Sequence, residues 1–497
     1  MAPPSGKREQ SLQRHMVRGS VWTISMRWSI RLAGLIGTVI LARLLTPADY
    51  GIVSIASMIV GIVEVFGRAG QASAIVRHPN PTREHYDSAW TVSLLLGLGL
   101  GLLIWAMVPL TTAYFHEPRA KLVVEILAFR TMLSGSQNIA VLNFQRNLQF
   151  NRQFWFSITP EFVAFVVTVI AAFALRNYWA LVIGFMSQHV TNFTLSYAME
   201  PYRPRICFSK VREIWSFSIW TLLRNIASYF NLLVDRVAIG GFAGSAGMGR
   251  YYVATDLATS PSQELVAPIV GVMFPVMATV QNDVRKRREL YLDVLYWSAL
   301  ICSSTAIGVA LVANDMVDLV LGPKWQDVKP LMPWLALSYG ILGLGSSVYT
   351  ALETIGQPRL SAQMQWMRLL GMALVIIPYA FFFRDIHGVA VMRFAVSIAV
   401  MPTLFFVLSR PFDLSFRDFV ATLWRPFVSG LAMVPVVLGI NSTIAVSGNP
   451  RLFLDIAAGG ATYLGMTMLL WFLTGKPRGP ELQVWQRISR KLPAPAG

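Results

Sequence analysis

The chain has 497 residues, of which 55% are apolar and only 13% are charged. That charged share is about half of the share usual in soluble proteins, and a helix that crosses a bilayer uses about 20 apolar residues. The composition excludes a soluble enzyme with a small membrane anchor, because roughly fourteen crossings would use the whole length. The apolar runs are continuous rather than alternating, which disfavours a transmembrane β-barrel.

Apolar runs long enough to span a bilayer follow one another along the whole chain. We expect about 14 transmembrane helices, at residues 20–44, 50–67, 88–113, 122–143, 155–175, 178–199, 213–234, 250–278, 292–313, 331–354, 361–383, 387–409, 426–446 and 453–474. Charged residues and a glycine-rich stretch at 240–249 interrupt the seventh and eighth of these runs. The sequence therefore predicts an all-α polytopic membrane protein.

Short motifs recur at one spacing along the chain and predict an internal repeat. The Ser, Trp and Thr of SVWTISMR, which begins at Ser20, return in SIWTLLR, which begins at Ser218. Gly51 and Gly249 repeat at the same spacing, and each precedes an apolar helix. A spacing of six helices brings the chain back to the same side of the membrane. We therefore expect two pseudo-symmetric six-helix lobes, with substrate handled where they meet, plus two C-terminal helices.

The charges predict how the chain is oriented. The 42 Lys and Arg residues outnumber the 25 Asp and Glu residues, and most of them fall on the side that holds both tails. The positive-inside rule then places both termini in the cytoplasm, without a role for nucleic acid. We expect no removable signal peptide. The predicted organisation is an N-terminal tail (1–19), an N-lobe (20–199), a basic cytoplasmic linker (200–212), a C-lobe (213–409), helices 13 and 14 (410–474) and a C-terminal tail (475–497).

Arginines inside the predicted spans are candidates for anion binding, because ionisable groups at membrane depth are costly and usually functional. Arg27 and Arg31 lie four residues apart on one face of the first helix. Arg224 has the matching place in helix 7, and Arg130 lies near the middle of helix 4. Guanidinium groups bind phosphate oxygens in pairs, so we assign these four to substrate binding. Arg27 could instead extend to the cytoplasmic interface, and Arg393 is expected to reach the outer one.

Three acidic residues are candidates for coupling transport to an ion gradient. Asp256 and Glu264 lie eight residues apart, on roughly one face of helix 8, and neither has a basic residue four positions later. A membrane carboxylate without a local partner can bind a proton or a cation. The alternative is that one of them pairs with an arginine of another helix. Glu64 in helix 2 is the third candidate, although Arg68 at the next turn could pair with it.

The sequence lacks the patterns of several enzyme classes. No G-x-x-x-x-G-K-[ST] phosphate-binding loop is present, and the six histidines show no metal-ligand spacing. We therefore expect no cofactor, no metal and no catalytic residue. The interpretation that remains is a secondary transporter.

The stretch LARLLTPADYGIVSIASMIVGIVEVFGRAGQASAIVR (41–77) resembles the polysaccharide flippase family of the multidrug/oligosaccharidyl-lipid/polysaccharide exporter superfamily. Ala89–Trp90, the FHEP loop (115–118) and NFQRNLQFNRQF (143–154) follow in the order found in that family. The resemblance implies a flippase that moves undecaprenyl-diphosphate-linked oligosaccharides across the bacterial inner membrane, driven by an ion gradient, for exopolysaccharide, capsule or O-antigen synthesis. The family has no fixed site, so the arginine assignments rest on this sequence alone.

Partners and alternatives follow from the same resemblance. The implied partners are the lipid-linked oligosaccharide, membrane lipid, and a polymerase and glycosyltransferases of the same pathway. A multidrug and cation exporter of the same superfamily is the first alternative, but the deep charges here are mostly basic. A lipid II flippase is a second alternative within the same class. A membrane glycosyltransferase or polymerase is a third, and the short loops disfavour it.

Overall fold

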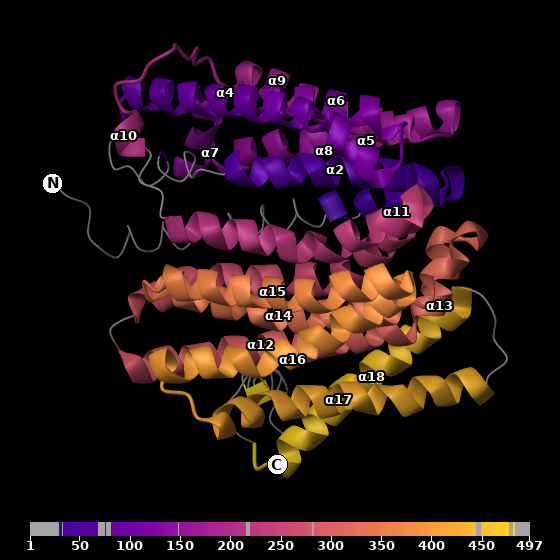
Figure 1. Cartoon of the computed structure of the whole chain (residues 1–497). Helices are drawn as coiled ribbons and strands as arrows, with labels where there is room; N and C mark the ends of the chain where they lie inside the picture. Colours follow the sequence, from indigo (N-terminus) through magenta and orange to yellow (C-terminus); the bar gives the residue numbers. More distant parts are fainter. Residues whose placement is uncertain are drawn as a thin grey trace, which may run out of the picture. The chain divides into compact units, whose positions relative to one another are not determined.

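The computed structural model describes residues 29–31, 33–67, 75, 81–147, 149–214, 219–280, 283–443, 449–476 and 481–482, which form helices joined by short connections (Figure 1). Ten helices of this part are long and apolar enough to cross a membrane. The expectation of an all-α polytopic membrane protein is confirmed in this coarse form. The fourteen crossings and the arrangement of the lobes remain predictions.

The chain divides into two compact units, and the first comprises residues Met1–Tyr229 and Ala243–Gly249. Residues 33–44 are helical. They are followed by α2 (Pro47–Gly67), α4 (Arg83–Ala106), α5 (Val108–Phe115), α6 (Ala120–Gly135), η1 (Ile139–Val141), α7 (Leu142–Arg146), α8 (Phe150–Leu175), α9 (Trp179–Met199) and α10 (Val211–Ile214). Helices α4 and α6 pack closely because a Cβ on Gly97 would lie only 2.7 Å from the Cα of Gly135. The GLGLG run of α4 therefore serves helix packing.

The linker that follows α9 is held against the first turns of α4 by side chains of that helix. A carboxylate oxygen of Asp87 accepts a hydrogen bond from the backbone N–H of Arg205 at 2.9 Å. The hydroxyl of Ser88 accepts one from the backbone N–H of Lys210 at 3.2 Å. Extended backbone has no internal hydrogen bonds, so these side chains satisfy donors that the linker itself cannot pair. The linker is thus an ordered part of unit 1.

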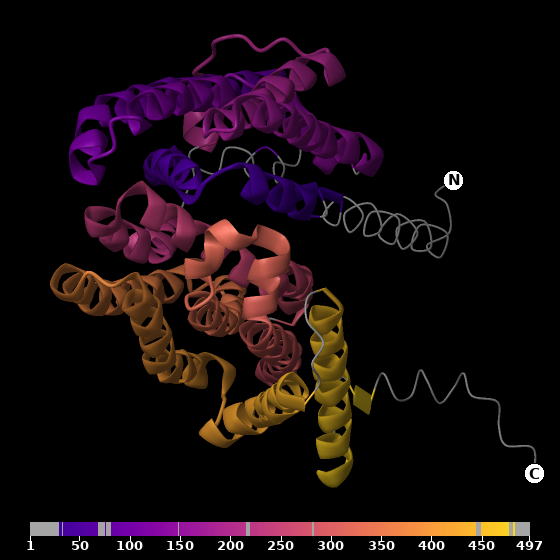
Figure 2. The same ribbon diagram turned by 90° about the vertical axis from the view of Figure 1, so that its right-hand side faces the viewer.

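The second unit comprises Phe230–Phe242 and Arg250–Gly497. Most of α11 (Ile219–Thr279) belongs to this unit. The elements that follow it are α12 (Val284–Leu311), α13 (Ala313–Met316), η2 (Val317–Leu321), η3 (Pro323–Val328), α14 (Met332–Thr354), α15 (Pro358–Phe383), α16 (Ile386–Phe412), α17 (Phe416–Thr443) and α18 (Asn449–Leu473). Helix α12 packs on α14 and α17, and α17 packs on α18, both yellow in Figure 2. Aromatic residues stabilise the centre of this unit, where the fully buried rings of Tyr291 and Phe412 lie 5.0 Å apart between centroids.

Helix α11 (Ile219–Thr279) covers residues 219–234 of the run predicted at 213–234 and all of the run predicted at 250–278. Its helical course is broken at Gly244, where φ is 62° and ψ is −171°. A positive φ of this kind is accessible to glycine at little cost, which explains the glycine-rich stretch. We call residues 243–249 the elbow, and residues 230–242 and 250–279 the two arms of α11. The elbow belongs to unit 1, whereas both arms belong to unit 2.

Candidate functional site

Two of the predicted site residues form an ion pair inside unit 1. The Nη2 of Arg130 on α6 lies 2.9 Å from Oε1 and 3.1 Å from Oε2 of Glu64 on α2. The hydroxyl of Thr131 also donates to Glu64, at 3.1 Å. Arg68, the partner that the sequence suggested for Glu64, lies outside the described residues. The structure thus places one predicted anion-binding residue and one predicted coupling residue together.

This pair is partly open to its surroundings. The side chains of Arg130 and Glu64 are 19% and 24% exposed. The Nε of Arg130 is buried and has no hydrogen-bond partner among the described residues. A buried donor without a partner is destabilising, so this nitrogen is available to an additional acceptor.

Two of the three remaining predicted arginines, Arg31 and Arg224, lie on helices. Arg31 is helical, and its Nη2 is buried without a hydrogen-bond partner in the part of the chain that the structure describes. Arg224 lies near the start of α11 and donates from Nη2 to the Oδ1 of its neighbour Asn225 at 2.7 Å. Arg27 lies outside the described residues. Arg31 and Arg130 thus each have one buried guanidinium nitrogen without a hydrogen-bond partner among the described residues.

The two predicted coupling acids of α11, Asp256 and Glu264, are both exposed. They lie on the second arm, which contains Pro261 and is continuous with the elbow. Glu264 has no ion-pair partner among the described residues. The alternative, in which the acid pairs with an arginine of another helix, is therefore not observed for Glu264 in this part of the chain.

A second charged cluster, which the sequence did not predict, lies in unit 2. Arg393 on α16 donates from Nη1 to Oδ2 of Asp235 on the first arm at 2.7 Å, and both side chains are 0% exposed. The hydroxyl of Tyr251, on the second arm, donates to the same oxygen of Asp235. The guanidinium of Arg393 also lies 4.5 Å above the ring centroid of Tyr339. A cation over an aromatic face is stabilised further by the ring quadrupole.

The expectation that Arg393 reaches the outer interface is wrong, because this side chain is wholly enclosed. The reason is its partner: a guanidinium can stay at depth when a carboxylate neutralises it and oxygens accept its protons. The carbonyl of Asn231 provides one of these acceptors at 3.4 Å. Asp235 lies 158 positions away in the chain, so no local pattern pairs the two residues. The only sequence clue was an acidic residue beside the glycine-rich interruption of α11.

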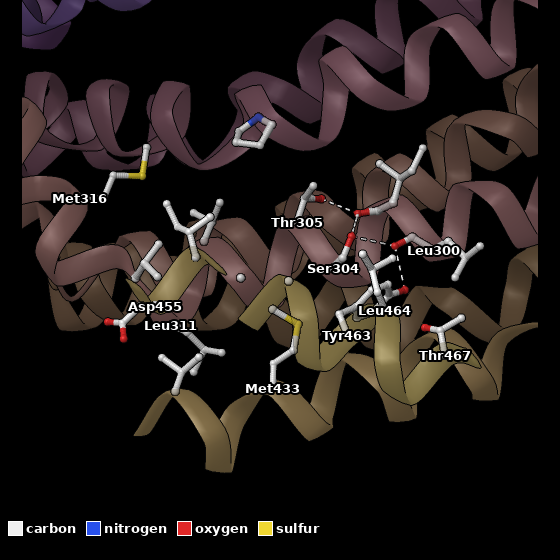
Figure 3. A pocket seen from close by; sticks show the side chains of 18 of the residues that line it. Leu300, Ser304, Thr305, Leu311, Met316, Met433, Asp455, Tyr463, Leu464 and Thr467 are labelled. Atoms are coloured by element: carbon white, nitrogen blue, oxygen red, sulfur yellow. Dashed lines mark hydrogen bonds between the residues drawn. The ribbon is translucent and has the colours of Figure 1, made fainter. Parts of the chain in front are cut away.

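An apolar cavity of about 700 Å³ lies among α12, α17 and α18 (Figure 3). Its lining includes Leu311, Met433 and Leu464. The hydroxyls of Ser304 and Tyr463 do not make it polar, because both donate to the carbonyl of Leu300, at 2.8 Å in each case. The lining is therefore mostly apolar, as a hydrocarbon chain requires, although the carboxylates of Asp455 and Glu481 also line it.

The described residues contain no group of three or more His, Cys, Asp or Glu that could hold a metal ion. The features that this part of the molecule does show are buried guanidinium nitrogens, two exposed carboxylates on α11 and a largely apolar cavity.

Comparison with known proteins gives these features a context. A family model described as "Polysaccharide biosynthesis protein" matches residues 40–330. The succinoglycan biosynthesis transport protein ExoT of Rhizobium meliloti is 26% identical, over 67% of this chain and 67% of its own length. The lipopolysaccharide biosynthesis protein WzxC of Escherichia coli is 22% identical, over 86% of this chain and 89% of its own length.

The fold also has a counterpart among solved structures. The lipid II flippase MurJ in its inward closed conformation matches with a TM-score of 0.74, covering 92% of this chain and 99% of that one. The identity is only 15%, so this likeness concerns the fold alone.

Proposed function

Because the chain belongs to the polysaccharide biosynthesis protein family, a family of membrane flippases and transporters, we propose that it moves an undecaprenyl-diphosphate-linked oligosaccharide from the cytoplasmic to the outer leaflet of the inner membrane. The observation on which this proposal chiefly depends is the buried Nη2 of Arg31, which has no hydrogen-bond partner among the described residues. A diphosphate provides oxygens for such a donor. Arg27, Arg130 and Arg224 complete the proposed substrate-binding set.

The lipid-linked nature of the substrate is supported by the apolar cavity beside α18. Its volume of about 700 Å³ lies within the range of sites that enclose small molecules. A hydrocarbon chain is the lipid part of a lipid-linked sugar. The product would enter exopolysaccharide, capsule or O-antigen synthesis, with a polymerase and glycosyltransferases as pathway partners.

We propose further that the two lobes alternate their access between the two sides, driven by an ion gradient. Asp256, Glu264 and Glu64 are the proposed coupling residues. A proton or cation that binds Glu64 changes the charge balance at Arg130, its ion-pair partner, which would link the gradient to substrate binding. Both termini lie in the cytoplasm in this scheme.

The test is export in a polysaccharide-producing host that carries Arg31→Ala or Arg224→Ala. We expect export to fall at least tenfold, because an unpaired buried phosphate oxygen costs more than about 1.4 kcal/mol. Arg31→Lys should retain part of the activity. The matched control is Arg285→Ala, which removes an arginine whose side chain is 89% exposed. Normal export by both alanine variants, at unchanged membrane abundance, would refute the anion site.

A further inference from the structure

The elbow of α11 makes unusually close contacts with the start of α2, within unit 1. A Cβ on Gly51 would overlap the backbone carbonyl of Ser245, and a Cβ on Gly249 would overlap the carbonyl of Pro47. Such approach is possible only between glycines and bare backbone. The two glycines that the repeat places at equivalent positions thus meet in one contact.

A polar contact adds to this backbone packing. Glu117, in the connection between α5 and α6, lies beside Ser245 of the elbow, whose hydroxyl helps to lower the pKa of its carboxyl. Its carboxylate is oriented by Arg119, which donates from Nε and Nη2 to its two oxygens at 2.7 and 2.9 Å. The elbow is therefore docked on unit 1 by close backbone packing, with this oriented carboxylate beside it.

The two arms that lead into and out of the elbow are joined to each other in unit 2. Asp235 lies on the first arm and Tyr251 on the second, and the tyrosine hydroxyl donates to the carboxylate. Arg393 holds the same carboxylate from α16. A charged hydrogen bond in a site without water is strong, and its loss leaves the remaining charge unsatisfied. The Asp235 carboxylate is therefore a contact that joins the two arms to each other and to α16.

We propose that Asp235, Tyr251 and Arg393 are positioning residues for transport, which hold the arms of α11 together so that the elbow stays docked on the start of α2. The inference rests on the proposed function for its link to transport. Its structural part, the dependence of elbow docking on the Asp235 carboxylate, is independent of any substrate.

The experiment measures docking directly by disulfide cross-linking in membranes. The parent protein carries Glu117→Cys and Ser245→Cys, with Cys207→Ser and Cys302→Ala to remove the native thiols. Copper phenanthroline should join the two new cysteines quickly in this parent. A parent that does not form the cross-link would contradict the docked elbow itself.

Tyr251→Phe is then added to the parent, since it removes only the bond between the arms and leaves the Asp235–Arg393 pair intact. We expect cross-linking to become about tenfold slower, the factor that corresponds to one charged hydrogen bond. Tyr291→Phe is the matched control, because Tyr291 is equally buried in unit 2 and its hydroxyl has no hydrogen-bond partner among the described residues. It should leave the rate within twofold of the parent.

A paired variant, Asp235→Leu with Arg393→Met, provides the second measurement. Replacing both members of a buried ion pair avoids an unpaired charge and preserves folding in many proteins. It should slow cross-linking as Tyr251→Phe does. Unchanged cross-linking in both variants overturns the inference, even if these variants no longer export. Such a result leaves the proposed function of the wild-type protein unaffected. Slower cross-linking in a protein that exports nothing supports the elbow while contradicting the proposed function.

Discussion

The Arg130–Glu64 pair of unit 1 and the Arg393–Asp235 pair of unit 2 join the same chemical groups at 2.9 and 2.7 Å. Their surroundings differ: the first pair is about one-fifth exposed, whereas the second has no exposed surface. Partial access lets water or a ligand replace one partner, while full burial makes separation very costly. The comparison teaches that the open pair is suited to exchange with a substrate and the closed pair to fixing helix positions.

The largest expected effect comes from breaking the closed pair on one side. Asp235→Ala would leave the guanidinium of Arg393 buried without a carboxylate, and we expect a loss of about 3–5 kcal/mol in folding stability. The thermal midpoint in detergent and the abundance in membranes measure this. Glu64→Ala is the matched variant at the open pair. A midpoint for Asp235→Ala that is no lower than that for Glu64→Ala would contradict the contrast between the pairs.

A smaller loss is expected from a methyl group in the elbow contact. Gly249→Ala places a Cβ against the carbonyl of Pro47, and backbone cannot rearrange as a flexible side chain does. We expect about 1–3 kcal/mol of destabilisation from this overpacking. Gly99→Ala is the control, because nothing lies within 4 Å of its added Cβ. Equal thermal midpoints for the two variants would show that the elbow is not tightly docked.

Breaking the open pair should affect stability least and transport most. Arg130→Ala is expected to cost at most about 1 kcal/mol, because solvent screens a partly exposed pair. Export should nevertheless fall, since the guanidinium belongs to the proposed substrate-binding set. Arg130→Lys keeps the charge but loses the bidentate fork, so it should recover only part of the export. A protein that is strongly destabilised by Arg130→Ala would place this pair with the structural one.

The mildest perturbation is a change of pH at the elbow. The hydrogen bonds from Arg119, assisted by the bond to Ser245, lower the pKa of Glu117 below its ordinary value of 4.5. A carboxyl with a lowered pKa stabilises the fold above its unfolded pKa and loses this contribution as the pH falls through its folded pKa. Hydrogen exchange at residues 243–249, corrected for intrinsic rates, should stay constant from pH 7 to pH 5 and accelerate only below pH 4.5. Glu117→Gln should remove this acid dependence, whereas acceleration between pH 7 and pH 6 would contradict it.

Much of the fold could be predicted from the sequence because a membrane span is a local property. A continuous apolar run of about 20 residues is sufficient to identify it, and the run predicted at 331–354 coincides with α14 (Met332–Thr354). The break in α11 was also visible, because only glycine takes the φ of 62° found at Gly244 without strain.

The site was less predictable because its contacts join residues far apart in the chain. Glu64 has a basic neighbour one turn away in the sequence, yet the structure pairs it with Arg130, 66 positions on. Arg393 shows no local partner at all, and only the packing of α16 on the first arm reveals Asp235. Helical periodicity reports neighbours on one helix and contains no information on which helices meet.

The central claim is that this chain moves a lipid-linked oligosaccharide across a bilayer. The most direct measurement reconstitutes the purified protein in liposomes that hold a fluorescent undecaprenyl-diphosphate oligosaccharide, and follows the fraction of label that a membrane-impermeant quencher reaches over time. The account predicts that label initially protected in the inner leaflet becomes accessible with the wild-type protein and stays protected with Arg31→Ala. The account would be contradicted if, under an imposed ion gradient, the labelled lipid moved no faster than in protein-free liposomes while the same preparation transported a cationic amphiphile.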